Sequence, residues 1–481
     1  MNVLNLCATF LLFTFSIFLL IVSSSNSLDV EVSAVEKYGV ICDAGSSGTR
    51  IFVYKISKSS ENQLMNIDTL VKDGKAVVKK VSPGLSSFGN HPEKVVEYFK
   101  PLLRFAELNI PAELINETPL FIFATAGMRL LPESQKSAII RNLREELGHI
   151  TQLKFDPKNI QIIDGSWEGI YSWISVNYIL GRLGNKEKKT VGMIDMGGAS
   201  VQIAMQIENE KMENDRNIFE IDLGTGNNLK YRVFSTTFLG FGANQGLEKY
   251  EKSLGSSLDH CSPKGLRKVR IVSEKQKIET EGTGEWDKCV KMVRESVKKE
   301  RCDSEMCYLD VNAPKGIDLS NTELFGFSEY WYTTRNFGSS GAYNYSKLTE
   351  NVNEYCTKSW EDIKIAKQNG GFKNVEESRM ETNCFKAAWI IAVLHDGFDV
   401  NEKKNQFQSV LEINGEEMQW ALGAMIYHMN TSGNSVEGSI DQSQFMIASY
   451  VLVFSVMMIL AFCLFREYHT RRRKISYSLM V

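Results

Sequence analysis

The sequence predicts an α/β protein made of two lobes that face each other, and three observations support this fold class. At 481 residues the chain exceeds the size, about 300 residues, at which a single hydrophobic core stops growing. Short apolar runs typical of buried strands alternate with segments of helical spacing, as at residues 120–123 and 134–147. One strand–turn–strand pattern occurs twice, at residues 40–51 and 192–203, so we expect one copy in each lobe.

The composition is that of an ordinary globular protein, with 43% hydrophobic and 23% charged residues. Its 55 basic and 58 acidic side chains give a net charge of −3, which argues against a nucleic-acid partner because phosphate neutralisation requires a clustered basic excess. Residues 466–481 hold five bases and one acid, which leaves 50 bases and 57 acids, or −7, for the rest. An acidic protein of this kind is expected to bind a polyanionic substrate through a metal ion and backbone amides.

Each end of the chain contains an uncharged apolar segment, residues 3–22 and 445–465, close to the roughly 20 residues that span a bilayer as a helix. Basic residues follow the second segment and place the tail, residues 466–481, in the cytoplasm. We interpret residues 1–27 as an uncleaved signal-anchor, with a cleaved signal peptide as the alternative. The predicted protein crosses the membrane twice, and residues 28–444 lie at the plasma membrane surface or in the Golgi lumen.

Cysteines and glycosylation signals agree with that compartment. An even set of cysteines in an oxidising compartment predicts disulfides, and pairing in sequence order closes the shortest loops. The six residues concerned are Cys261, Cys289, Cys302, Cys307, Cys356 and Cys384. The alternative is that these cysteines bind zinc, although no Cys-x-x-Cys occurs. Acceptor sequons for N-glycosylation begin at Asn116, Asn344 and Asn430.

The two repeated turns have the chemistry of a phosphate site. Each follows an aspartate, Asp43 or Asp195, and is rich in Gly and Ser. Successive backbone N–H groups of such a turn form a nest for phosphate oxygens. A carboxylate beside phosphate suits a divalent cation, held directly or through water. Two facing copies would hold adjacent phosphates of one polyphosphate, whereas a single copy would equally suit a surface turn.

A third loop supplies a candidate catalytic group. Residues 164–169 follow a predicted strand that ends at Ile163, and loops at the carboxyl ends of such strands gather into clefts. Within this loop Glu168 lies between Trp167 and Gly169, a setting that suits a carboxylate that orients and deprotonates water. The alternative is a solvated acid on a loop.

Five motifs resemble, in order, the signature regions of the apyrase family, the nucleoside triphosphate diphosphohydrolases. They are DAGSSGTR (43–50), ATAGMRLL (124–131), DGSWEGIY (164–171), DMGGASVQI (195–203) and WALGAM (420–425). The terminal anchors and the cysteines resemble those of membrane-bound members, and the short second lobe resembles plant members. The resemblance implies a two-lobed actin-like (RNase H-like) fold, with a cleft between the lobes and a transmembrane helix at each end.

The same resemblance implies roles for individual residues. Glu168 matches the catalytic base, and Asp43 and Asp195 match the residues that hold Ca²⁺ or Mg²⁺ through its water shell. The residues that match the nucleotide and phosphate site are Asp43, Ala44, Gly45, Ser46, Ser47, Gly48, Thr49, Arg50, Thr125, Arg129, Asp195, Met196, Gly197, Gly198, Ala199, Ser200 and Gln202. Met196 and Val201 depart from the commoner Leu and Thr, at positions without an acid–base role.

The predicted division of the chain follows from these assignments. It consists of residues 1–27 (signal-anchor), 28–165 (lobe I), 166–412 (lobe II), 413–444 (return to lobe I), 445–465 (transmembrane helix) and 466–481 (tail). The aromatic run at residues 325–332 could stack a base, although we favour a core role. Trp420 is expected on the cleft floor or at the lobe interface. The Lys- and Glu-rich residues 274–301 are expected to form a solvated helical face.

The predicted activity is metal-dependent hydrolysis of nucleoside tri- and diphosphates to monophosphate and phosphate. Other catalytic classes lack their signatures, since no Gly-x-x-x-x-Gly-Lys-Ser/Thr, Gly-x-Ser-x-Gly or His-Glu-x-x-His occurs. A sugar kinase on the same fold and a receptor for nucleotides or glycans that has lost turnover are the alternatives. The Glu168 loop and the oxidising compartment favour the hydrolase over the kinase.

Overall fold

The computed structural model describes most of the predicted ectodomain. The described residues are 36–57, 64–185, 187–207, 216–224, 229–255, 257–273, 276–297, 307–309, 311–312, 319, 322–401, 407–432, 464–466, 468–469 and 472. Residues 36–431 form one compact unit, and this unit contains both sheets and the candidate site.

The first sheet has six strands in the order β3-β2-β1-β7-β8, with β6 paired to β2. Strands β1 and β2 form an antiparallel hairpin, and β7 and β8 continue the sheet in parallel with β1. The strands are β1 (Lys37–Ala44), β2 (Thr49–Ser57), β3 (Asn66–Thr69), β6 (Val78–Val81), β7 (Leu120–Ala124) and β8 (Ile160–Ile162). A small hairpin of β4 (Val71–Lys72) and β5 (Lys75–Ala76) follows β3.

The second sheet repeats this arrangement. Its seven strands run in the order β11-β12-β10-β9-β18-β20-β19. Strands β9 and β10 form the hairpin, and β18 and β20 continue in parallel with β9. The strands are β9 (Gly192–Met196), β10 (Ser200–Gln206), β11 (Ile218–Asp222), β12 (Lys230–Leu239), β18 (Leu324–Ser328), β19 (Gly341–Ala342) and β20 (Phe407–Ser409). The predicted duplication of the hairpin is therefore confirmed. The parallel strands beside each hairpin are duplicated as well.

Helices α2 (Val95–Glu107) and α4 (Glu133–Glu146) cover the outer face of the first sheet. Because successive strand side chains point to opposite faces, Val40 and Cys42 of β1 pack toward these helices while Ile41 joins the core on the other face. The helix predicted at residues 134–147 is confirmed, with ends displaced by one residue.

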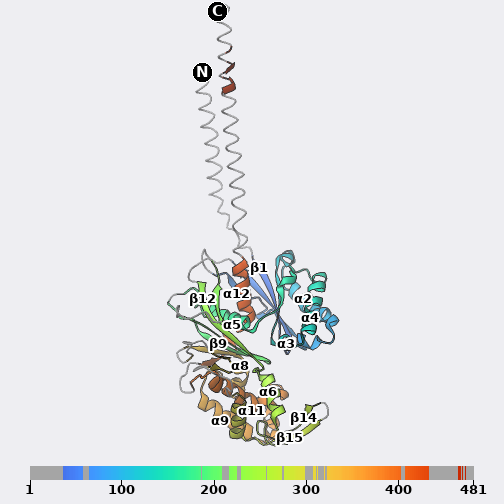
Figure 1. Ribbon diagram of the computed structural model, residues 1–481, viewed down its shortest axis with the longest axis vertical. Coiled ribbons are helices and arrows are strands. Elements are labelled where there is room, and N and C mark those ends of the chain that lie inside the picture. Colours follow the sequence, from blue (N-terminus) through green and yellow to red (C-terminus); the bar gives the residue numbers. More distant parts are fainter. Residues whose placement is uncertain are drawn as a thin grey trace, which may run out of the picture. The chain divides into compact units, whose positions relative to one another are not determined.

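Two helices lie between the sheets, α5 (Gly165–Ile179) and α12 (Trp420–Ser432) (Figure 1). Their side chains share one core with the inner faces of both sheets, where Phe123 and Met193 are buried. The two helices approach so closely that a Cβ on Gly423 would lie 1.8 Å from the carbonyl oxygen of Tyr171, so this position requires glycine. Through α12 the chain returns to the first sheet, where Met425 packs on Gly39.

The short helix α3 (Ala126–Arg129) follows β7, and six further helices share a core with the outer face of the second sheet. They are α6 (Ala243–Ser253), α7 (Trp286–Val297), α8 (Glu329–Asn336), α9 (Tyr345–Thr357), α10 (Trp360–Gln368) and α11 (Glu377–Ala392). The short strands outside the two main sheets are β13 (Leu258–Asp259), β14 (Arg267–Ser273), β15 (Gln276–Gly282), β16 (Cys307–Tyr308), β17 (Val311–Asn312), β21 (Glu412–Ile413) and β22 (Glu416–Glu417).

The expected helical face at residues 274–301 is only partly correct. Residues 276–282 form strand β15, because pairing with β14 outweighs the helix propensity of Lys and Glu. Helix α7 begins at Trp286, and its Cys289, Val293 and Val297 enter the core while charged side chains face solvent.

Two of the expected disulfides are confirmed, Cys261–Cys289 and Cys356–Cys384, with Cα atoms 4.8 and 5.9 Å apart. They exclude zinc as the partner of these four thiols. The third expected pair, Cys302 with Cys307, involves side chains outside the described residues.

The three sequons differ in accessibility. Asn116 and Asn344 are exposed, and both remain predicted acceptors. Asn430 is the least accessible of the three in this fold, because the residue is only 8% exposed and both ends of its amide are hydrogen-bonded. Its Nδ2 donates to the Ile426 carbonyl oxygen (2.8 Å), and its Oδ1 accepts from the Met65 N–H (3.1 Å).

The expected membrane segments, residues 3–22 and 445–465, lie outside the described residues except for Leu464 and Phe465. Among the helices that the structure does describe, none has the length and apolar character of a membrane span.

Candidate active site

The two hairpin turns are closed by equivalent backbone hydrogen bonds. The Gly45 N–H donates to the Gly48 carbonyl oxygen at 3.0 Å, and the Gly197 N–H donates to the Ser200 carbonyl oxygen, also at 3.0 Å. Each bond closes a four-residue turn between two antiparallel strands. The residue that pairs with the turn's aspartate across the hairpin is Arg50 in the first copy and Gln202 in the second.

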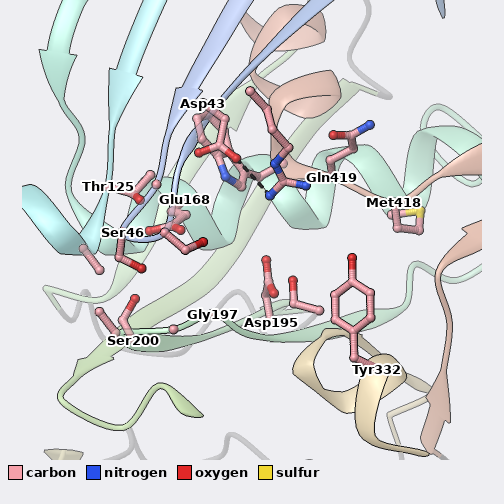
Figure 2. Close-up of a pocket in the computed structure, with 18 of the residues that line it drawn as sticks. Asp43, Ser46, Thr125, Glu168, Asp195, Gly197, Ser200, Tyr332, Met418 and Gln419 are labelled. Atoms are coloured by element: carbon pink, nitrogen blue, oxygen red, sulfur yellow. Dashed lines mark ion pairs between the residues drawn. The ribbon is translucent and has the colours of Figure 1, made fainter. Parts of the chain in front are cut away.

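The turns face each other across a cleft, in which Ser46 and Glu168 lie opposite Ser200 and Asp195 (Figure 2). The approach is close, since a Cβ on Gly198 would lie 3.0 Å from the Oγ of Ser46. The two predicted phosphate loops therefore line one site.

Helix α6 supports the second turn from behind. Its first N–H groups, from Ala243 and Asn244, donate to the carbonyl oxygens of Gly197 (3.0 Å) and Gly198 (2.9 Å). Because the C=O and N–H of one peptide unit point in opposite directions, the N–H groups of Gly198 and Ala199 point away from α6. These residues line the cleft, as an anion nest requires.

Glu168 lies in the first turn of α5, which Asp164 caps by accepting the Ser166 N–H at 2.8 Å. The side chain is buried, and its Oε2 accepts from Arg129 Nη2 (3.1 Å) and Gln202 Nε2 (3.0 Å). This carboxylate is therefore held by donors from two other elements, α3 (Ala126–Arg129) and β10.

Burial is the largest cause that raises the pKa of Glu168 to about 8; the nearby carboxylates of Asp195 and Asp43 contribute to the rise, and the charge of Arg129 opposes it. A carboxyl group with such a pKa can exchange a proton near neutral pH. A general base requires such a pKa, whereas an exposed loop acid keeps the ordinary value.

The two aspartates occupy equivalent places but have different partners. Asp43 pairs with Arg50, with Nη2 and Oδ2 3.2 Å apart. Asp195 is buried, and its Oδ1 has no hydrogen-bond partner within the described part of the chain. Burial raises the pKa of both carboxyl groups, so a cation would be favoured beside them.

The residues present fit a hard divalent cation. Two carboxylates line one cleft, and the unpartnered Oδ1 of Asp195 is an oxygen of the type that Ca²⁺ and Mg²⁺ prefer. Within the ranges that the structure describes, no group of three or more His, Cys, Asp or Glu side chains is arranged to hold a metal.

Most of the predicted site residues line this cleft. They are Asp43, Gly45, Ser46, Ser47, Arg50, Thr125, Glu168, Asp195, Gly197, Gly198, Ala199 and Ser200. Arg129 and Gln202 reach it through their hydrogen bonds to Glu168. The remaining residues lie behind the cleft surface, since Ala44, Thr49 and Met196 are buried in strands and Gly48 packs on the Val81 carbonyl.

The structure adds residues that sequence reasoning missed. They are Ala126, Ser328, Tyr332, Val410, Leu411, Glu417, Met418 and Gln419. The aromatic run divides, because Phe325, Phe327 and Tyr330 are core residues as favoured, whereas Tyr332 is 38% exposed and lines the cleft. The sequence signals for this group were the aromatic run, for Tyr332, and the motif at residues 124–131, for Ala126.

Trp420 lies both at the cleft and at the interface between the lobes, the two places considered for it. It lines the cleft, and its ring stacks on Tyr171 of α5 with centroids 6.4 Å apart, in the core between the sheets.

Duplicated sheets, opposed Gly- and Ser-rich turns and a buried carboxylate in one cleft define a two-lobed, actin-like α/β enzyme. The chain matches the model of the GDA1/CD39 (nucleoside phosphatase) family over residues 30–443, and it belongs to that family.

Curated relatives agree with this membership. Nucleoside-triphosphatase ntp-1 of Caenorhabditis elegans is 53% identical over 94% of this chain and 84% of its own length. Nucleoside-diphosphatase mig-23 of Caenorhabditis briggsae is 44% identical (85% and 80% covered), and Golgi apyrase of Schizosaccharomyces pombe is 35% identical (82% and 75% covered). These nematode and yeast relatives give no support to the expected plant-like character.

Among solved structures, the crystal structure of nucleoside triphosphate hydrolases from Neospora caninum superposes with a TM-score of 0.59. It covers 87% of this chain and 97% of its own, at 15% sequence identity, which shows the shared fold.

Proposed function

We propose that this protein hydrolyses the terminal phosphoanhydride bond of nucleoside tri- and diphosphates, with water as the acceptor and nucleoside monophosphate as the final product. The observation that carries the proposal is the convergence of Glu168 with the two opposed turns in one cleft. The names of the relatives, a triphosphatase, a diphosphatase and an apyrase, support this substrate class.

In the proposed mechanism the turns bind the phosphates. The N–H groups of Gly198 and Ala199, with the hydroxyls of Ser46 and Ser200, would hold the transferred phosphoryl group between the two lobes. Because phosphoryl transfer depends mostly on positioning and charge stabilisation, this preorganised set of donors would supply much of the catalysis. No covalent enzyme intermediate is required.

Glu168 would accept the proton of the attacking water. Its Oε2 is bonded to Arg129 and Gln202, which fixes the direction of the carboxylate and leaves Oε1 for water. Ser200 Oγ, 2.6 Å from Gln202 Nε2, extends the same network to the phosphate turn. The network would therefore align water with the terminal phosphate.

Asp43 and Asp195 would hold Ca²⁺ or Mg²⁺ through its water shell. When bound, the cation would neutralise charge on the phosphate oxygens. Because the two carboxylates would act through water, water and phosphate oxygens would be the direct ligands of the cation.

Tyr332 is the candidate for contact with the base. Its ring is partly exposed at the cleft and packs under Arg379, whose guanidinium carbon lies 5.0 Å from the ring centroid. Stacking on an aromatic face tolerates every base, so broad base tolerance is expected.

We place residues 28–444 in the Golgi lumen or at the cell surface, held by membrane segments at both ends. The apolar segments, the two disulfides and the Golgi relative support this location. Microscopy of a tagged protein distinguishes the two compartments.

The test is phosphate release from ATP and ADP by the detergent-solubilised full-length protein, with Ca²⁺, with Mg²⁺ and with EDTA. Release that depends on metal is expected. Binding of ATP without release in all three conditions would favour a receptor, and transfer of phosphate to a sugar instead of water would favour a kinase.

A further inference from the structure

Ser328 has an unusual backbone conformation at the edge of the cleft. It joins β18 to α8 with φ 55° and ψ −115°, a region that strongly favours glycine. Other non-glycine residues with positive φ occur in the described chain, but Ser328 is the one among them that lines the cleft. A side chain retained at a strained position indicates that the side chain has a use.

The surroundings hold this conformation in place. The next residue, Glu329, is buried and accepts from Thr333 Oγ1 (2.7 Å) and Arg379 Nη1 (2.7 Å), with Lys386 Nζ at 3.3 Å. These bonds fix the first turn of α8. The strained junction is thus imposed by packing, and a glycine would be the simpler solution for the backbone alone.

Ser328 and Asp195 line the same cleft, and burial raises the pKa of the Asp195 carboxyl group while the neighbouring Ser328 hydroxyl favours its charged form. Strands β18 and β9 are parallel neighbours, and their register places Ser328 beside Met196 at the ends of both strands. The Ser328 hydroxyl therefore lies at the strand end beside Asp195, whose Oδ1 has no hydrogen-bond partner in the described structure.

We propose that Ser328 is a positioning residue for the cation site, which holds the Asp195 carboxylate so that Oδ1 remains free for the hydrated metal. The inference rests on the proposed function. It explains why serine occupies a position where the backbone favours glycine: the hydroxyl is needed, and glycine would lack it.

Two substitutions separate the hydroxyl from the strain. Ser328→Ala removes the hydroxyl and keeps the strain, whereas Ser328→Gly removes both. Ser409→Ala is the matched control, because Ser409 is buried and bonds Thr334 of α8 at 2.7 Å without lining the cleft. All are made in the full-length protein.

Two measurements are made on each variant: the Ca²⁺ concentration that gives half-maximal phosphate release from ATP, and the Ca²⁺ titration of the melting temperature with a non-hydrolysable ATP analogue. Both Ser328 variants are expected to require about ten-fold more Ca²⁺ in each measurement, since a charged hydrogen bond is lost. At saturating Ca²⁺ their kcat should stay within about three-fold of wild type. Ser409→Ala should lower the melting temperature without changing the Ca²⁺ requirement.

An unchanged Ca²⁺ requirement in Ser328→Ala would overturn the inference. A wild-type Ca²⁺ requirement in Ser328→Gly would also overturn it, because the position would then need only a suitable backbone conformation and no hydroxyl. If the wild-type protein binds Ca²⁺ and nucleotide without releasing phosphate, the proposed function fails. The thermal titration still decides the role of Ser328 in that case.

Discussion

At the scale of single residues, the behaviour of Glu168 is set by its immediate neighbours. Burial disfavours its charged form, while Arg129 and Gln202 bind that form at 3.1 and 3.0 Å. The balance leaves Glu168 with a pKa of about 8, far above its ordinary value of 4.5. This balance leads to three predictions, two for the base itself and one for its charged partner.

Glu168→Gln keeps the size of the side chain and removes the base. We expect kcat to fall by about 100- to 10,000-fold while ATP binding, measured by calorimetry, stays near wild type, because the turns that bind phosphate are unchanged. Glu133→Gln is the control, since Glu133 lies in the first turn of an exposed helix end. Substantial turnover by Glu168→Gln would refute the assignment.

The rate should depend on pH through Glu168. Its ionised form is the active one, and with a pKa of about 8 roughly a tenth of the protein is ionised at pH 7, so kcat/KM should rise with pH. Bound cation between the aspartates should move this rise to lower pH.

The raised pKa of Glu168 also means that the folded state holds the proton more tightly than the unfolded state does. The contribution of Glu168 to stability is therefore lost as pH rises from about 4.5 toward 8.

The positive charge of Arg129 lowers the pKa of Glu168 and so opposes the effect of burial. Arg129→Gln removes the positive charge, so the rise in kcat/KM should move to higher pH, whereas Arg129→Lys keeps the charge and should move it less. Profiles recorded between pH 5 and about 9.5 would measure both. A profile of Arg129→Gln that moves to lower pH would contradict the electrostatic account.

At the scale of elements, the second phosphate turn depends on the helix behind it. Gly242 caps α6 with an ordinary φ of −64°, so its requirement for glycine is steric rather than conformational. A Cβ at this position would lie 2.4 Å from the Ala199 backbone nitrogen. The turn can therefore keep its shape only if residue 242 has no side chain.

Gly242→Ala should displace the turn at residues 197–200 and reduce kcat/KM by about 100-fold, the loss typical of a 1 Å misplacement. The circular dichroism spectrum should remain that of the wild type. Gly255→Ala is the control, since a Cβ there meets no atom within 4 Å. Full activity of Gly242→Ala would show that the turn is not held by α6.

At the scale of the whole molecule, the core between the sheets joins the lobes. Helix α12 contributes Trp420 at the cleft and Met425 against β1, and α5 contributes Glu168 and Tyr171. Because one pair of helices supports both the site and the contact between sheets, the cleft and the lobe packing are not independent. The disulfides, by contrast, lie in the outer helical layer of the second sheet.

Loss of the Cys356–Cys384 disulfide should therefore reduce stability and spare catalysis. For cysteines 28 residues apart, the chain-entropy model gives about 3–4 kcal/mol. The double substitution of Cys356 and Cys384 by Ala should lower the melting temperature, and the drop that dithiothreitol causes should be smaller than in wild type. A fall in kcat at a temperature where the variant is folded would contradict this.

The sequence by itself determined the duplicated hairpins, the two aspartates and Glu168. These features are local: a strand, a Gly- and Ser-rich turn and a carboxylate occupy consecutive residues, so their pattern is visible without the fold. The acidic net charge and the even cysteine set were equally readable, and the described disulfides follow the expected sequence order.

Only the tertiary structure decided which other residues meet that site. Ser328 reaches Asp195 from a strand more than a hundred residues later, and Tyr332 leaves the core while Tyr330 stays in it. Asn430 carries a valid sequon, yet a bond from the Met65 N–H and burial remove it from solvent. Each outcome depends on packing between distant segments, and no local sequence pattern contains that information.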